Sequence, residues 1–195
     1  MPKLGMGPIR RRQLIDAAIA SIHEFGIADA TVARIAAKAG VSTGIVHHYF
    51  TDKNDLLFET MRQLLADLRM AAVENYAAAH NPRQRIEAVI RACFGDPQFS
   101  PEVIAAWLAL YGSSRQSPRL QEILRIYHAR LRSNLLHDLR LLMQETEAIR
   151  AAEGIAAMID GLWVRQALRG GTQSAELSRD ITLRYLDAIL TKAIS

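Results

Sequence analysis

Apolar residues recur every three or four positions along most of the chain, and this spacing predicts amphipathic α-helices throughout. Proline, glycine and polar capping residues separate one periodic segment from the next. The predicted helices span residues 9–26, 31–39, 42–50, 52–80, 82–94, 101–111, 118–142, 147–168 and 174–194. No segment shows the alternation that is typical of a half-buried strand. The pattern therefore predicts an all-α fold of about nine helices.

Two of these helices are short and are joined by a tight turn between Thr31 and Phe50. Thr31 and Ser42 stand at the two helix starts, where a hydroxyl can accept from the free amides of the first turn. Gly40 supplies the left-handed residue that closes the first helix. Each helix is expected to turn one apolar face toward the core. This face comprises Val32, Ile35 and Ala36 on the first helix and Ile45, Val46 and Tyr49 on the second. A helix–turn–helix of this size commonly places its second helix in the major groove of DNA.

Charge strengthens this interpretation. The 195-residue chain carries a formal net charge of +4. Residues 1–53 hold seven basic and four acidic side chains, so a net +3 is concentrated around the helix–turn–helix. Binding to a polyanion through such a surface should weaken steeply with added salt, because each neutralised phosphate releases counterions.

Several classes of protein fit the sequence poorly. The single cysteine, Cys93, cannot build a disulfide framework and is expected to be a buried thiol. The longest apolar run, residues 103–111, is too short to cross a bilayer, so a cytoplasmic protein without membrane contact is expected. No Glu-x-x-His pair, nucleophile–base motif or set of metal ligands is present, which argues against an enzyme and against a metal site or cofactor.

The second helix of the motif carries the side chains expected to read DNA. Thr43, His47 and His48 can reach base edges or phosphate oxygens, and Gly44 lets the backbone approach closely. A competing interpretation is that the two histidines are merely exposed polar residues. The full set of predicted DNA contacts is Arg10, Thr31, Arg34, Ser42, Thr43, Gly44, His47, His48, Tyr49 and Lys53.

The first fifty-odd residues resemble the N-terminal domain of the TetR family of transcriptional repressors. The matching features are the basic amphipathic first helix, Phe25-Gly26, Thr31, Ile35-Ala36, Ala39-Gly40-Val41-Ser42, Tyr49-Phe50 and Lys53, with residues 159–163 resembling the family's penultimate helix. The resemblance implies a DNA-binding domain over residues 8–68 and a ligand-binding and dimerisation domain over residues 69–195. It also implies a homodimer, formed through the last two helices, that binds a pseudo-palindromic double-stranded operator.

Residues 1–17, Gly40–Ile45 and His48–Phe50 are most similar to the choline-responsive members of the family. This likeness implies a repressor of the genes that convert choline to glycine betaine, an osmoprotectant, with DNA binding relieved by choline or a related quaternary ammonium compound. A TetR-type repressor of another ligand, such as a hydrophobic drug or an acyl thioester, is the alternative. A helical-bundle enzyme is a remote one.

Proteins hold a quaternary ammonium group against aromatic faces, often beside a carboxylate. Aromatic residues make up only 6% of this chain. The candidate ligand residues are Phe94, Trp107, Tyr111, Tyr127, Asp160 and Trp163. Trp107 and Tyr111 are four apart, and Asp160 and Trp163 are three apart, so each pair should share a helix face. Aromatic residues at helical spacing are more often part of the core, which is the competing interpretation.

Overall fold

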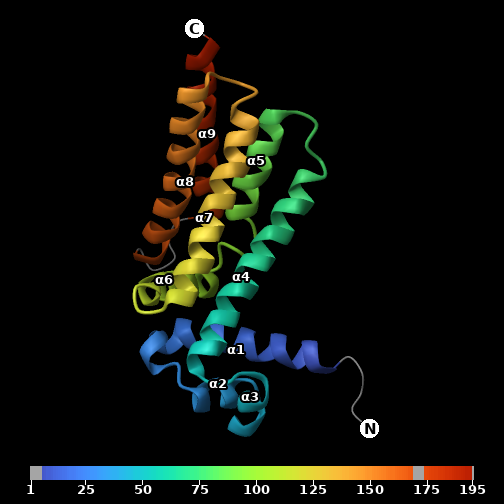
Figure 1. Cartoon of the computed structure of the whole chain (residues 1–195), viewed down its shortest axis with the longest axis vertical. Coiled ribbons are helices and arrows are strands. Elements are labelled where there is room, and N and C mark those ends of the chain that lie inside the picture. Colours follow the sequence, from blue (N-terminus) through green and yellow to red (C-terminus); the bar gives the residue numbers. More distant parts are fainter. Residues whose placement is uncertain (1–5, 169–173, 195) are drawn as a thin grey trace. The chain divides into compact units, whose positions relative to one another are not determined.

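The computed structural model describes residues 6–168 and 174–194, with side chains placed as far as Lys192. This part of the chain is all-α and contains no strand, which confirms the predicted fold class (Figure 1). Its nine helices are α1 (Met6–Asp29), α2 (Val32–Lys38), α3 (Thr43–Tyr49), α4 (Lys53–Tyr76), α5 (Pro82–Cys93), α6 (Pro101–Ser114), α7 (Pro118–Leu139), α8 (Glu145–Leu168) and α9 (Ala175–Ile194).

Helix boundaries follow local capping chemistry. Asp52 accepts from the amide of Asp55 at 2.8 Å at the start of α4, and Asn81 accepts from Gln84 at 2.9 Å at the start of α5. Gly26 interrupts α1 with a φ of 75°, where the sequence predicted an end. Two predicted ends were several residues too late, since α4 stops at residue 76 rather than 80 and α7 at residue 139 rather than 142.

The helices form two compact units. The first contains the described residues up to Leu64 together with Ala105–Gln121, and the second contains residues 65–104 and the described residues from Glu122 onward. The sequence-based division at residues 68 and 69 stays a prediction. None of the helices in residues 6–168 and 174–194 has both the length and the apolar character needed to cross a membrane.

The core of the first unit is built from large apolar side chains of α1 to α4. Those that are almost completely buried include Leu14, Ile15, Ile35, Val46, Leu56 and Met61, together with Phe50 directly after α3. A side-chain amide adds a polar tie, because Gln13 of α1 donates at 2.7 Å to the carbonyl oxygen of Ala39 at the end of α2. The helix–turn–helix is thus held on α1 by both apolar packing and a hydrogen bond.

The second unit is built around α8. Its buried face consists of Ala148, Ala151, Ala152, Ile155, Ile159, Leu162, Trp163 and Gln166. Small residues on α8 allow α9 to pack closely, and the phenol of Tyr185 lies against the backbone of Gly154. The two helices run side by side (Figure 1). Burial of this face contributes to the apolar stabilisation of the unit.

Candidate DNA-reading surface and effector site

The turn between α2 and α3 has the geometry that the sequence predicts at most positions. Gly40 adopts a φ of 66°, and the amide of Val41 donates at 3.0 Å to the carbonyl oxygen of Ala36. Thr31 caps α2 by accepting from the amide of Arg34 at 3.3 Å. Ser42 has the backbone of an N-cap, with φ −77° and ψ 156°, but its hydroxyl makes no capping hydrogen bond. The expectation of a side-chain cap at Ser42 was therefore wrong, and this exposed hydroxyl does not serve the helix.

All four of the predicted base-reading residues of α3 are accessible to solvent. Thr43, Gly44, His47 and His48 are all exposed, whereas Val46 is buried. Since successive residues of a helix are rotated by about 100°, Val46 fixes the inward direction, and Gly44 lies near the middle of the opposite side. The four predicted readers are therefore presented together on a single short helix.

One of the apolar positions expected to point inward on α3 does not. Ile45 is 37% exposed, so its predicted place in the core was wrong. The physical reason is the shortness of α3, seven residues long, whose inward direction is taken by Val46. Tyr49 is half-buried, and its ring lies edge-on to that of His48 with the centroids 5.1 Å apart.

Two cations among the predicted DNA contacts hold the end of α1. Lys53 donates its ammonium to the carbonyl oxygens of Ile27 at 2.7 Å and Ala28 at 3.0 Å. Arg34 donates at 3.0 Å to the carbonyl oxygen of Asp29. Cations at a helix C-terminus satisfy its unpaired carbonyl groups and offset the negative end of its dipole. These side chains have a structural role that the sequence reasoning missed.

Other cations of the first unit are paired within the protein. Lys38 lies 2.6 Å from Glu24, and Arg12 lies 2.9 Å from Asp16. Arg10, a further predicted contact, donates at 2.7 Å to the amide oxygen of Gln13. The first unit keeps its net positive charge, but many of its cations are paired within the protein. Their charge attracts DNA mainly through the long-range electrostatic potential.

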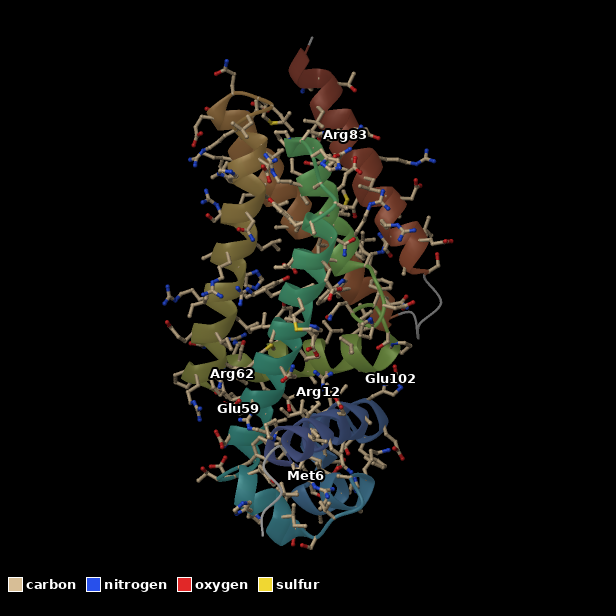
Figure 2. All side chains as sticks on the ribbon, turned by 90° about the vertical axis from the view of Figure 1, so that its right-hand side faces the viewer. Met6, Arg12, Glu59, Arg62, Arg83 and Glu102 are labelled. Carbon is tan, nitrogen blue, oxygen red and sulfur yellow. The ribbon has the colours of Figure 1, made fainter. Side chains whose placement is uncertain are left out.

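Glu59 forms ion pairs with two arginines of this unit, a role that the sequence did not predict. Its carboxylate lies 2.6 Å from Arg11 of α1 and 2.9 Å from Arg62 of α4, and Figure 2 shows Glu59 and Arg62 as neighbours. Burial alone would raise the pKa of Glu59. The hydrogen bonds and charges of Arg11 and Arg62 outweigh that effect and hold this pKa below its usual value. The pair with Arg11 fixes α1, which carries the helix–turn–helix, to α4.

In the second unit, the structure brings Asp160 and Trp163 together on α8 with two residues from other helices. The indole of Trp163 is buried and donates at 3.1 Å to the carbonyl oxygen of Cys93. Asp160 has one oxygen 3.9 Å from the Nδ1 of His128. Its other oxygen is buried and has no hydrogen-bond partner among the described residues. His128 was not foreseen, because it lies on a different helix and 32 positions away in sequence.

The environment of Asp160 shifts its titration. Burial raises the pKa of this carboxyl above its ordinary value, and the charge of His128 partly opposes the rise. Burial first, and then the charge of Asp160, raises the pKa of the Cys93 thiol to about 12. Cys93 is therefore the neutral buried thiol that the sequence predicted.

The other predicted ligand aromatics are divided between the two units. Phe94 is buried and meets Phe99 edge-on at 5.4 Å, and the ring of Tyr127 lies 5.1 Å from that of His128. These residues belong to the second unit. Trp107 and Tyr111 belong to the first, with their rings 5.5 Å apart and Trp107 fully buried.

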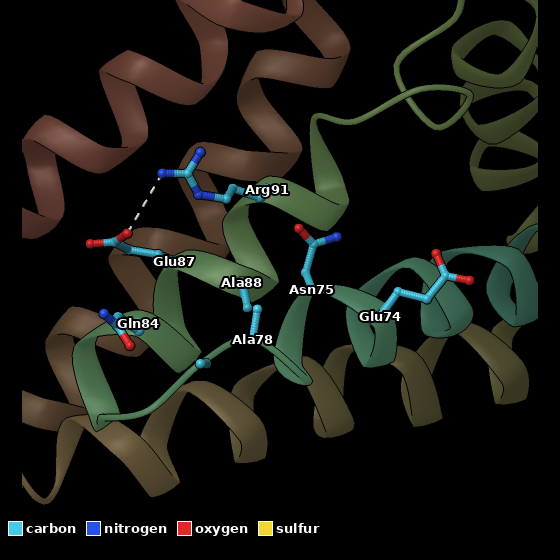
Figure 3. A pocket seen from close by; sticks show the side chains of 8 residues that line it. Glu74, Asn75, Ala78, Gln84, Glu87, Ala88 and Arg91 are labelled. Carbon is cyan, nitrogen blue, oxygen red and sulfur yellow. Dashed lines mark ion pairs between the residues drawn. The ribbon is translucent and has the colours of Figure 1, made fainter.

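A cavity of about 400 Å³ lies between the end of α4 and α5 in the second unit (Figure 3). Alanine side chains and polar groups line it, including an ion pair of 3.7 Å between Glu87 and Arg91. It contains none of the predicted ligand residues and no aromatic side chain. A quaternary ammonium group would find no aromatic face there.

Family models cover both parts of the chain. Residues 14–60 match the model for bacterial regulatory proteins of the tetR family. Residues 82–191 match the model for the C-terminal domain of the BetI-type transcriptional repressor. The chain belongs to the BetI-type repressors of the TetR family. This confirms the resemblance seen in the sequence.

Relatives of this BetI-type repressor align over almost its full length. The HTH-type transcriptional regulator BetI of Rhizobium meliloti (strain 1021) is 48% identical, with 97% of this chain and 94% of the relative covered. BetI of Stenotrophomonas maltophilia (strain R551-3) is 45% identical, with 99% of each covered. These relatives are transcriptional regulators rather than enzymes, as the sequence predicted.

Solved structures share the fold. A protein described as a transcriptional regulator from Pseudomonas aeruginosa PAO1 superposes with a TM-score of 0.75 at 27% identity, covering 95% of this chain and 92% of its own. A regulator from Saccharomonospora viridis, in complex with choline, has a TM-score of 0.79 at 21% identity, covering 91% and 95%. The second comparison establishes the fold alone. TetR-family regulators bind operator DNA as dimers, and this chain is a repressor of that type.

Proposed function

We propose that this BetI-type repressor binds a pseudo-palindromic operator of the genes that convert choline to glycine betaine, and that choline relieves repression. The exposed readers of α3 and the names of the full-length relatives support this proposal. The observation that supports choline as the effector is the buried oxygen of Asp160 that has no hydrogen-bond partner, three residues from Trp163.

A carboxylate oxygen without a hydrogen-bond donor is costly to bury, and a cation that forms no hydrogen bonds suits it. The trimethylammonium group of choline is such a cation, because its positive charge is permanent and it carries no N–H. Trp163 supplies an aromatic ring whose orientation is fixed by the hydrogen bond to Cys93. A contact with such a ring contributes about 0.5–2 kcal/mol.

The neighbouring groups suit a cation as well. The thiol of Cys93 stays neutral at physiological pH, since its pKa is about 12. His128 is the competing partner of Asp160, with its Nδ1 3.9 Å from the carboxylate. Binding of choline would therefore replace a distant histidine with a closer cation. The choline complex of the Saccharomonospora viridis regulator supports the capacity of this fold to hold choline, without assigning residues here.

A dimer through the last two helices is part of the proposal. On α8, Val164 is 39% and Leu168 is 80% exposed, and on α9 Leu177 is 50% exposed. Gly161 lies on the same side of α8 as Val164 and has open space where a Cβ would stand. Contact with a second copy would bury these apolar groups, and two copies would supply two reading helices for the two operator half-sites.

Footprinting on the DNA upstream of the encoding gene, with and without choline, tests the proposal. We expect two protected half-sites that are lost with choline and retained with betaine or sodium chloride at equal ionic strength. Protection that choline leaves unchanged, but a hydrophobic drug or acyl thioester abolishes, would support the alternative effector. Absence of protection, with no binding to any choline-gene promoter, would contradict the proposed target genes.

A further inference from the structure

The exposed isoleucine of α3 stands among polar residues. Ile45 is 37% exposed, and the other exposed residues of the helix are Thr43, Gly44, His47 and His48. A half-exposed aliphatic side chain is common on protein surfaces and needs no explanation by itself. Its position on the reading helix of a DNA-binding repressor, however, allows an apolar contact with a base.

Helical geometry places Ile45 at the edge of the reading surface, next to His48. With about 100° between successive residues, the Ile45 direction lies roughly 100° from Gly44 and 60° from His48. Gly44 has no side chain that could stand between Ile45 and an approaching base pair. The buried Val46 lies about 100° away on the other side and anchors the helix. Ile45 therefore borders the side that faces DNA.

The major groove offers one apolar group to such a side chain. Each thymine presents its C5 methyl there, while the other base edges present hydrogen-bond donors and acceptors. The histidines and the threonine of α3 can satisfy those polar edges, but Ile45 cannot. Burial of the Ile45 side chain against a methyl group would remove apolar surface of both partners from water.

We infer that Ile45 is a specificity-determining residue that contacts a thymine C5 methyl in each operator half-site. This inference rests on DNA binding by the family and is independent of the choline proposal. In synthetic, unmodified DNA, thymine is the sole source of a pyrimidine C5 methyl. Replacement of a thymine by deoxyuridine therefore removes this methyl group and changes nothing else in the DNA.

The experiment pairs thymine-to-deoxyuridine replacement with Ile45→Ala. A duplex selected from a random pool by the wild-type protein provides the probe, and each symmetric pair of thymines is replaced by deoxyuridine in turn. For wild type, we expect one pair of positions to weaken binding about three- to tenfold per half-site, the value of one buried methyl group. For Ile45→Ala, replacement at that pair should have no further effect.

Matched controls separate this contact from a loss of folding. Ile126→Ala changes the same residue type at nearly the same exposure, 38%, on α7, and should retain the wild-type response to every deoxyuridine. Ile45→Val keeps part of the contact and should respond in between. Thermal melting should be alike for all three variants, because neither isoleucine is buried.

Two outcomes would overturn the inference. Equal sensitivity of wild type and Ile45→Ala to every deoxyuridine pair would exclude a methyl contact by Ile45. So would a wild-type protein that binds the selected duplex but is insensitive to all replacements. Failure to select any DNA would instead contradict the DNA-binding function itself, so the two failures are distinguishable.

Discussion

The phenol of Tyr76 on α4 donates a 2.6 Å hydrogen bond to the Oδ2 of Asp138 on α7. Arg85 of α5 donates at 2.7 Å to the other carboxylate oxygen. Asp138 is 1% exposed, so two partners satisfy a buried charge and tie three helices of the second unit together. The end of α4 is thereby fixed to α5 and α7.

Replacement of Tyr76 by phenylalanine should destabilise the protein by about 1 kcal/mol, the net value of one hydrogen bond, with more if the charge of Asp138 is left undersatisfied. Urea denaturation at pH 7 measures it. A free energy of unfolding equal to that of the wild type would contradict a stabilising role for this bond.

Alkaline pH gives Tyr76→Phe a second signature. Burial, then the hydrogen bond and charge of Asp138, raises the pKa of Tyr76 from 10 to about 12. The folded state therefore keeps a proton that the unfolded state loses, and this stabilisation is complete below pH 10 and lost as the pH rises through 12. The wild type should lose more of its stability than Tyr76→Phe between pH 10 and 12, as thermal melts across this range would measure.

Close packing of α8 on α9 makes Gly154 a sensitive position. A Cβ there would lie 3.0 Å from the Cζ of Tyr185 and closer still to its hydroxyl. Gly154→Ala should destabilise the protein by about 1–3 kcal/mol through overpacking, which exceeds the roughly 1 kcal/mol of helix propensity that alanine adds. Tyr185→Phe should reduce this cost, because it removes the atom in the shortest contact.

A second glycine provides the control for this prediction. Gly112 of α6 has open space where its Cβ would stand, so Gly112→Ala should leave stability unchanged or raise it by up to about 1 kcal/mol. Chemical denaturation of Gly154→Ala, Tyr185→Phe and the double variant gives the coupling energy between these two positions. Equal effects of alanine at positions 112 and 154 would show that the contact with Tyr185 is not limiting.

Local chemistry is what the sequence predicted well. The cap at Thr31 and the left-handed turn at Gly40 depend on residues within a few positions of one another, and both were confirmed. The family resemblance was also confirmed. Helix ends such as that of α7 were predicted less well, because apolar periodicity continues past the last helical residue.

Contacts over long sequence separations were beyond the reach of periodicity. The pair of Tyr76 and Asp138 joins residues 62 positions apart, and no local pattern marks either residue as a partner. Ile45 illustrates the opposite problem. Its apolar character suggested the core, but it lies about 100° around α3 from the buried Val46 and is 37% exposed. The sites themselves were proposed from residue type, and their polar neighbours, such as His128, required the three-dimensional structure.

Histidine and lysine at the reading surface should respond differently to alanine. His47 is exposed on α3 and holds nothing in place, so His47→Ala should weaken operator binding about 5- to 100-fold with an unchanged melting temperature. Lys53 binds the carbonyl oxygens at the end of α1, so Lys53→Ala should also cost about 1–3 kcal/mol of stability. Gel-shift titration and thermal melting distinguish the two, and unchanged affinity in His47→Ala would count against α3 as the reading helix.

Asp160→Asn should raise stability while it weakens the response to choline. Because burial raises the pKa of Asp160, the folded state binds its proton more tightly, and stability falls as the pH rises from 3.8 through that raised value. At pH 7 the buried charge of Asp160 is a cost that His128 and the partial exposure of the side chain offset only in part, so asparagine should raise the melting temperature by about 1–3 °C.

Choline should stabilise the wild type more than Asp160→Asn, because its cation requires the ionised carboxylate of Asp160. Asp160→Asn should bind choline at least about tenfold more weakly in a calorimetric titration at pH 7, and choline should raise its melting temperature less than that of the wild type. Asp180→Asn removes a carboxylate that is 54% exposed on α9, and it should bind choline normally. If Asp160→Asn bound choline as tightly as the wild type, Asp160 would not be the cation's partner, whatever its effect on stability.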